Sequence, residues 1–243
     1  MKKFCPTMLT IGPTIPSGYL DHRRGKDDME YGFSLFASED ACGCMDWLNK
    51  KPAGSVVYVS FGSLADLSVK QIEEIALGLK GCSNSYNFLW VVRASQQEKL
   101  PDKFVEETKN QGLVVKWSPQ LEVLSNEAVG CFLTHSGWNS TVEALCLGVP
   151  MVCMPQWTDQ PTNAKLVEDV WKVGVRVKVD DDNIDGIFQS ENIKSAIREV
   201  MEGERARDIK KSATKWRNVA IEAISQGGTS DKNIEEFISK LKS

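Results

Sequence analysis

A run of seven residues near the middle of the chain, His135 to Thr141 (HSGWNST), has the composition of an anion-binding turn. It follows the apolar run Val129–Leu133 and precedes a helix-forming stretch from Val142, so the order predicts a strand, a tight turn and a helix start. Gly137 lets the backbone turn and come close to a ligand, and the free N–H groups of the first helical turn carry partial positive charge. The run therefore predicts a pyrophosphate site without a cationic side chain. An ordinary N-capped helix is the alternative.

Polar side chains within and after this run add possible ligand contacts. His135, Asn139 and Ser140 can donate hydrogen bonds to phosphate oxygens. Glu143 follows Ser140 by about one helical turn and should face the same side, where its carboxylate can accept hydrogen bonds from paired ribose hydroxyls. These residues extend the predicted pyrophosphate site towards a nucleotide.

An aromatic residue should lie at the same edge of the predicted sheet. Trp117 ends the β-like run Leu113–Lys116 and precedes Ser118, so a parallel strand should deliver it to the ligand-bearing edge. An indole at this place can stack on a uracil. A core aromatic residue at a strand end is the alternative interpretation.

A second polar loop should converge on that edge. Asp159 and Gln160 follow the apolar run Val149–Pro155, and they offer acceptor and donor groups suited to sugar hydroxyls. The alternative is that Thr158 or Asp159 caps the next helix. Capping and ligand binding are compatible, so both interpretations stay open.

The segment Trp117–Gln160 contains no Lys or Arg, and it resembles the 44-residue signature box of the plant UDP-dependent glycosyltransferases that modify small secondary metabolites. The turn Ser60–Ser63 looks like the Gly-Ser/Thr turn of that family. The resemblance implies a complete set of donor-binding residues: Trp117 and backbone atoms of Ser118 on the uracil, Gln120 and Glu143 on the ribose, His135, Asn139, Ser140 and Ser63 on the phosphates, and Trp138, Asp159 and Gln160 on the sugar. Gln rather than His at the last box position is similar to members that prefer UDP-glucose to UDP-galactose.

Members of this family are about twice as long as the chain, and their two Rossmann-like domains face each other across a cleft in the GT-B arrangement. The chain resembles only the second half. In the family the catalytic base is a His of the first domain, oriented by an Asp, and the acceptor pocket lies largely in that domain. His135 is assigned to phosphate and His22 lies in a charged stretch typical of a linker, so we expect no catalytic residue in this chain.

The pattern of apolar runs predicts an α/β fold with a doubly wound parallel sheet, Rossmann-like in type, because strand-like runs alternate with amphipathic helices. Residues Ser68–Gln71 form a capping-box pattern, and apolar residues at helical spacing should then cover the sheet. The predicted strands are Val56–Phe61, Phe88–Val92, Leu113–Lys116, Val129–Thr134, Met151–Met154 and Val175–Val179.

Two ends of the chain differ from this globular pattern. Residues 1–38 are rich in Pro, Gly and charge, which predicts an interdomain linker before a UDP-sugar-binding domain at residues 39–243. A final helix at residues 230–242, capped by Ser230, should carry the apolar stripe Ile234, Phe237, Ile238 and Leu241. In the family this helix reaches the first domain, and without that surface the stripe should favour self-association.

Composition excludes several classes of partner. The net charge of −4 and the mixing of Arg and Lys with acidic residues at 205–217 argue against nucleic acid. No apolar run reaches the ~18 residues of a membrane span, and Met1–Pro6 lacks a signal-peptide core. We expect all seven cysteines to be reduced and noncatalytic, which suits the cytoplasm, and Asp180–Asp182 to be a solvated turn rather than a metal site.

Three functions follow from these patterns. The first is the UDP-glucose-binding domain of an inverting glycosyltransferase that transfers glucose, without a metal, to a hydroxyl or carboxyl of a small molecule bound with the first domain. The second is a stand-alone UDP-sugar-binding module without catalysis, which we expect of the isolated chain. The third, a nicotinamide-dependent dehydrogenase, is disfavoured because the first strand leads into Phe61–Asp66 and no Gly-x-Gly-x-x-Gly follows.

Overall fold

The computed structural model describes residues 8–20, 40–82, 85–179 and 185–241, with the side chains of residues 40–42 left aside. Its centre is a six-stranded sheet in the order β3-β2-β1-β4-β5-β6, and all neighbouring strands are parallel. The strands are β1 (Val56–Ser60), β2 (Asn87–Val91), β3 (Gly112–Val115), β4 (Val129–Thr134), β5 (Met151–Cys153) and β6 (Gly174–Arg176). The doubly wound order is confirmed, and the strand order reverses between β1 and β4.

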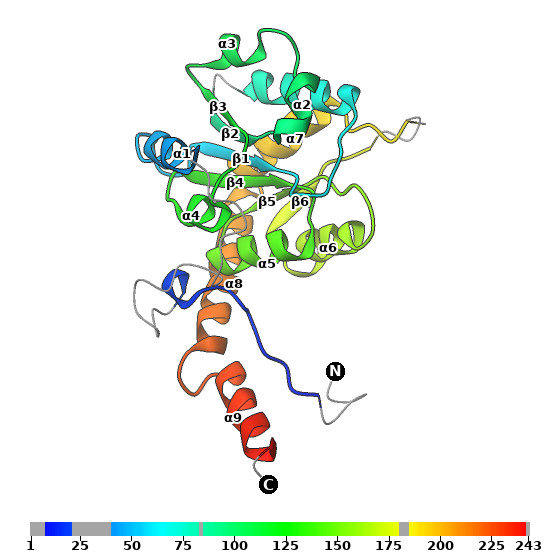
Figure 1. Cartoon of the computed structure of the whole chain (residues 1–243). Helices are drawn as coiled ribbons and strands as arrows, with labels where there is room; N and C mark the ends of the chain where they lie inside the picture. The colour runs from blue at the N-terminus through cyan, green and yellow to red at the C-terminus, as the bar shows by residue number, and fades with distance from the viewer. Residues whose placement is uncertain (1–7, 21–39, 83–84, 180–184, 242–243) are drawn as a thin grey trace.

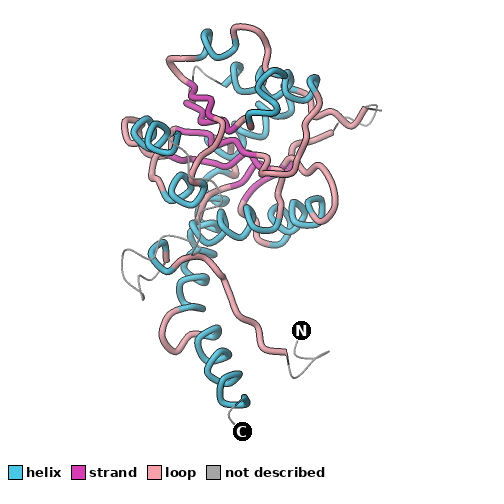
Figure 2. Tube along the Cα trace, in the orientation of Figure 1, coloured by secondary structure: helices cyan, strands magenta, loops and turns pink. Residues whose placement is uncertain are grey.

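Helices cover both faces of this sheet (Figures 1 and 2). One apolar cluster joins α2 and α7 to one face, and a second joins α1, α4, α5, α6 and α8 to the other. The elements are η1 (Ser17–Tyr19), α1 (Asp40–Leu48), α2 (Val69–Cys82), η2 (Ala94–Lys99), α3 (Phe104–Thr108), α4 (Gln120–Ser125), α5 (Trp138–Leu147), α6 (Gln160–Lys165), η3 (Leu166–Val170), α7 (Ser190–Met201), α8 (Ala206–Ile224) and α9 (Thr229–Leu241).

The helix predicted after Ser68 forms as α2, but only half of its predicted capping box is present. The Ser68 hydroxyl accepts a hydrogen bond from the Gln71 N–H at 3.1 Å. The Gln71 side chain does not return to Ser68, because its amide pairs with the backbone of Phe188 at 2.9 and 3.0 Å. Its apolar face, Ile72, Ile75, Ala76 and Leu79, is buried as predicted.

Part of the predicted linker packs on the domain. Ile15, Tyr19 and Leu20 are buried in the second apolar cluster, which the linker prediction did not anticipate. The prediction that Ser230 caps the last helix is wrong, because Ser230 is the second residue of α9 and its hydroxyl pairs with the N–H and C=O of Gly12 at 3.1 and 2.5 Å. A linker role for residues 1–38 stays a prediction, and His22 lies outside the described residues.

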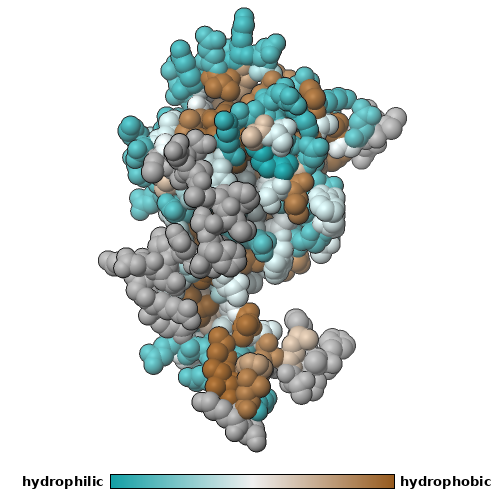
Figure 3. Space-filling model, viewed as in Figure 1, coloured by the Kyte–Doolittle hydropathy of each residue, from teal (hydrophilic) through white to brown (hydrophobic). Residues whose placement is uncertain are grey.

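Helix α9 exposes an apolar surface at the end of the molecule away from the sheet (Figures 1 and 3). The exposed fractions of Ile234, Phe237, Ile238 and Leu241 are 41%, 56%, 44% and 71%. The predicted stripe is therefore present and uncovered by the described residues. Its docking partner stays a prediction.

Other compositional expectations can be compared with the structure. Lys210, Lys211, Lys215 and Arg217 lie exposed on α8, so the predicted solvated face of this helix is confirmed. The five cysteines whose side chains the structure describes are buried and form no disulfide bond, and burial raises the pKa of Cys153 to about 12, which keeps that thiol protonated near neutral pH. Within the described ranges, no helix combines the length and apolar character needed to cross a bilayer. Asp180–Asp182 lies outside them.

Candidate functional site

Four connections meet at the carboxyl edge of the sheet. Ser63 follows β1, Trp117 follows β3, the turn at residues 135–137 follows β4, and Asp159 follows β5. This edge, at the reversal between β1 and β4, is where doubly wound sheets bind ligands. The fold thus gathers the predicted site residues from loops far apart in sequence.

The predicted strand, turn and helix start are confirmed between β4 and α5. The residue with left-handed backbone is Ser136, at φ 62°, whereas Gly137 is extended at φ −61° and ψ 149°. Gly137 is required for another reason, because a Cβ atom there would lie 2.5 Å from His135 Nε2. The first helical bond runs from the Thr141 N–H to the Gly137 carbonyl at 2.9 Å, so the N–H groups of residues 138–140 lack an intrahelical acceptor.

Gln120, the first residue of α4, joins Glu143, its predicted partner at the ribose, to the predicted phosphate residue Ser140. Its side-chain amide donates to the Ser140 hydroxyl at 3.0 Å and to Glu143 Oε2 at 2.6 Å. The prediction that Ser140 and Glu143 face the same side is therefore confirmed. Both residues are buried, and the Gln120 side chain holds them in position.

Sequence reasoning missed Tyr58 of β1, whose hydroxyl contacts the side chains that lie just after β3. The Tyr58 hydroxyl lies 2.9 Å from the Ser118 hydroxyl and donates to Gln120 Oε1 at 3.4 Å. Its ring is buried and stacks on Phe132 at 4.8 Å between centroids, and burial raises the pKa of the phenol. The only sequence signal was a hydroxyl-bearing residue inside an apolar strand.

His135 lies between two glycines that leave room for its ring. A Cβ on Gly62 would lie 2.9 Å from the imidazole, and one on Gly137 would lie closer still. Burial lowers the pKa of His135, and the Asp159 charge opposes this. The imidazole is therefore neutral near pH 7 with a single N–H, and its ring is hydrogen-bonded to the backbone of Ser60.

Several polar groups of the loop after β5 form hydrogen bonds within the loop itself. The Gln160 side-chain oxygen accepts from the N–H groups of Gln156 and Trp157 at 2.8 and 3.1 Å, and its amide N–H groups point to no described acceptor. Asp159 accepts from Thr158 and Asn163 side chains at 2.9 and 2.7 Å, which lowers its pKa. Neither Thr158 nor Asp159 forms the predicted side-chain cap. Asp159 makes no hydrogen bond that caps α6, and the Thr158 hydroxyl donates to Asp159 instead.

A cavity of about 250 Å³ opens beside the start of α5. Its lining includes Trp138, Asn139 and Glu143 from the predicted site, together with Thr14 and Ile15. These last two were missed because their segment was assigned to a linker. Trp117, partly buried, lies three residues before Gln120 on the β3–α4 connection.

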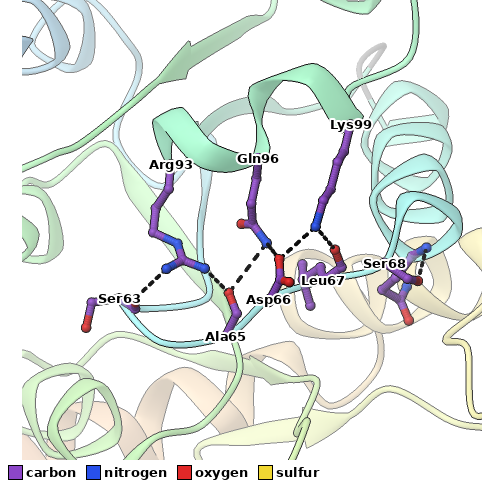
Figure 4. Close-up of polar contacts among 9 residues, drawn as sticks. Ser63, Ala65, Asp66, Leu67, Ser68, Arg93, Gln96 and Lys99 are labelled. Carbon is purple, nitrogen blue, oxygen red and sulfur yellow. Dashed lines mark hydrogen bonds and ion pairs between the residues drawn. The ribbon is translucent and has the colours of Figure 1, made fainter.

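Ser63 lies exposed on the connection between β1 and α2, next to Gly62, whose backbone is left-handed at φ 72°. Arg93 donates to the carbonyl of Ser63 from the neighbouring connection (Figure 4). Because Gly62 contacts His135, this loop and the β4–α5 turn meet. No described group of three or more His, Cys, Asp or Glu residues could hold a metal ion. That the reaction needs no metal ion stays a prediction.

Comparison with known proteins gives consistent matches. The family described as UDP-glucoronosyl and UDP-glucosyl transferase matches residues 36–214. Flavonol 7-O-beta-glucosyltransferase UGT74F1 of Arabidopsis thaliana is 55% identical over 243 residues, which are 100% of this chain and 52% of that protein. Mogroside I-E synthase of Siraitia grosvenorii is 55% identical over 234 residues, 96% of this chain and 50% of that protein.

A solved structure shares the fold. Os79 of O. sativa, crystallised in complex with UDP, superposes with a TM-score of 0.90 at 46% identity. The match covers 98% of this chain and 51% of the Os79 chain. The chain therefore spans about half the length of the proteins that it matches.

Proposed function

Because the chain belongs to the family of UDP-glucoronosyl and UDP-glucosyl transferases, we propose that it is the UDP-glucose-binding half of an inverting glycosyltransferase. The enzyme would transfer glucose to a hydroxyl or carboxyl group of a small molecule. One observation carries the proposal: Gln120 links Ser140 and Glu143 beside the amino terminus of α5, so a ribose and a diphosphate can bind side by side.

In the proposed reaction the acceptor oxygen attacks the anomeric carbon and UDP departs from the opposite face. Negative charge would grow on the departing diphosphate, which in this proposal lies in front of the N–H groups at the start of α5. The Ser140 hydroxyl adds a donor. Fixed donors would therefore take the place of a metal ion.

The remaining machinery is proposed to come from the half of the enzyme that this chain does not match. That half would supply the catalytic base and most of the acceptor pocket. The names of two relatives, a flavonol glucosyltransferase and a mogroside synthase, support a hydroxylated small molecule as the acceptor. We place the enzyme in the cytoplasm. A stand-alone binding module is not favoured, because the relatives are named as transferases or synthases.

Calorimetric titration of this chain with UDP-glucose, UDP-galactose and UDP tests the proposal. We expect UDP and UDP-glucose to bind more tightly than UDP-galactose, and Trp117→Ala to weaken all three by a similar factor because the stacked base is common to them. The control is Trp47→Ala, which removes a partly buried Trp of α1 that is not among the predicted site residues. Absence of UDP binding at millimolar concentration would reject the proposal.

A further inference from the structure

The connection between β1 and α2, residues 61–68, is long for its place in the fold. Most strand-to-helix connections of this kind have about 2 to 6 residues. Phe61, Ala65 and Leu67 are buried and anchor it, whereas Ser63 and Leu64 face solvent, Leu64 with 79% of its surface exposed. Three buried side chains do not by themselves fix the backbone that lies between them. Hydrogen bonds to the carbonyl groups of the loop would hold that backbone in place.

The donors of such hydrogen bonds come from the next connection, formed by Arg93 and η2. The Arg93 guanidinium donates to the carbonyls of Ser63 and Ala65. Lys99 Nζ donates to the carbonyl of Leu67 at 2.9 Å. Figure 4 shows these side chains reaching from one ribbon to the loop in a row.

Asp66 completes the contact between the two connections. Its carboxylate accepts from Gln96 Nε2 at 3.0 Å and from Lys99 Nζ at 2.7 Å. Gln96 is buried, so the contact includes a fixed polar group as well as surface charges. Two adjacent connections are thus held together at four residues of the loop, Ser63, Ala65, Asp66 and Leu67.

We propose that Arg93, supported by Gln96 and Lys99, is a positioning residue for the diphosphate part of the donor site. It fixes the backbone of Ser63, so that the loop carrying the Ser63 hydroxyl keeps its place beside the turn at residues 135–137. The contact of Gly62 with His135 places the loop against that turn, and the two N–H groups of one rigid guanidinium set the spacing of two carbonyls. The inference rests on the proposed function, since it assumes a nucleotide diphosphate at this edge.

A contact that only stabilised the fold would affect every ligand alike. Positioning of Ser63 affects the diphosphate and leaves the nucleoside unchanged. The test therefore measures the dissociation constants of UDP and of uridine for each variant, with thermal melting as a check of folding. For Arg93→Met we expect UDP binding to weaken about 3- to 10-fold, the range of one or two lost hydrogen bonds, and uridine binding to change less than about 2-fold.

Two more variants identify how Arg93 acts. Arg93→Lys keeps the charge but cannot span both carbonyls, so it should lose about as much UDP affinity as Arg93→Met. Ser63→Ala combined with Arg93→Met should be no weaker than Ser63→Ala alone, because the two residues act through one hydroxyl. The control Lys80→Met removes a cation that joins α2 to Glu107 at 2.6 Å, away from the loop, and should leave both ligands unaffected.

The outcomes separate this inference from the proposed function. If the unmodified chain does not bind UDP, the proposed function fails. If it binds UDP, the positioning role is overturned by equal losses for UDP and uridine, by wild-type affinity in Arg93→Met or Arg93→Lys, or by multiplied losses in the double variant. If Arg93→Met melts early, Lys99→Met, which removes the contacts with Leu67 and Asp66 and keeps both Arg93 hydrogen bonds, is measured in its place with the same expected selectivity for UDP.

Discussion

The carboxyl edge of the sheet and helix α9 use their side chains in opposite ways. At the edge, polar groups such as Gln120, Glu143 and Tyr58 pair with one another, so their hydrogen bonds are made within this chain. On α9, apolar side chains such as Phe237 and Leu241 remain exposed. A polar site can thus be completed within one chain, whereas an apolar stripe needs a second surface to bury it.

Gly137→Ala is the substitution with the largest expected effect on the polar edge of the sheet. The added Cβ would lie 2.5 Å from His135 Nε2, so the imidazole or the start of α5 has to move. We expect a loss of about 1 to 3 kcal/mol in stability, typical of overpacking, and at least a comparable loss of UDP affinity. Chemical denaturation and calorimetry measure the two effects. Unchanged UDP binding would show that the turn is not part of the site.

Removal of the buried carboxylate tests the pairing itself. Glu143→Ala takes away both an acceptor of the Gln120 amide and the proposed ribose partner, and a charged hydrogen bond contributes about 1.5 to 3 kcal/mol. UDP affinity should fall by that amount in calorimetry. Glu122→Ala, exposed on α4, is the matched control and should bind UDP normally. Equal behaviour of the two variants would contradict the ribose assignment.

Tyr58→Phe tests the polar pairing at the edge of the sheet, because it removes one hydroxyl and keeps the ring stacked on Phe132. Without that hydroxyl, Ser118 and Gln120 lose a buried partner, and UDP binding should weaken by about 0.5 to 1.5 kcal/mol. Tyr86→Phe removes a phenol hydroxyl next to the amino end of β2 and should leave the affinity unchanged. A loss in Tyr86→Phe as large as that in Tyr58→Phe would argue against a local effect.

The pH dependence of stability tests the burial of His135. Its pKa in the folded chain is below the ordinary value of about 6.5, so below that pH the unfolded chain binds more protons and stability falls. The contribution is complete above pH 6.5 and is lost as the pH falls towards the folded pKa. Melting temperatures at pH 7.5 and 5.5 should therefore differ more in the wild type than in His135→Asn. Equal differences would place the imidazole in solvent.

The smallest effect on the donor site is expected from α9. Phe237→Asp should leave UDP affinity unchanged and reduce concentration-dependent association measured by light scattering, because it interrupts the exposed stripe. Leu77→Asp, which changes an exposed apolar residue of α2 at the other end of the molecule (Figure 1), is the control and should not alter association. A wild-type chain that stays monomeric at high concentration would show that the stripe does not self-associate.

Most of the fold could be read from local patterns. The strands at residues 129–134 and 151–153 follow apolar runs, and each predicted strand lies within a few residues of the observed one. Errors arose where a side chain found a distant partner. The Gln71 side chain pairs with Phe188, and the Ser230 side chain pairs with Gly12, so neither side chain makes its predicted cap hydrogen bond. Hydrogen bonds across more than a hundred residues leave no local signal.

The sequence by itself determined the strand, turn and helix at residues 129–147 and the residue types offered to a ligand, because both depend on hydrophobic spacing and local backbone preference. Tertiary structure decided which of them meet. Tyr58 donates a hydrogen bond to Gln120, Arg93 donates one to the loop that carries Ser63, and Ile15 packs in the core. These contacts form because parallel strands bring separate connections to one edge. The physical reason is that pairing across a sheet depends on the whole chain, whereas periodicity depends only on neighbours.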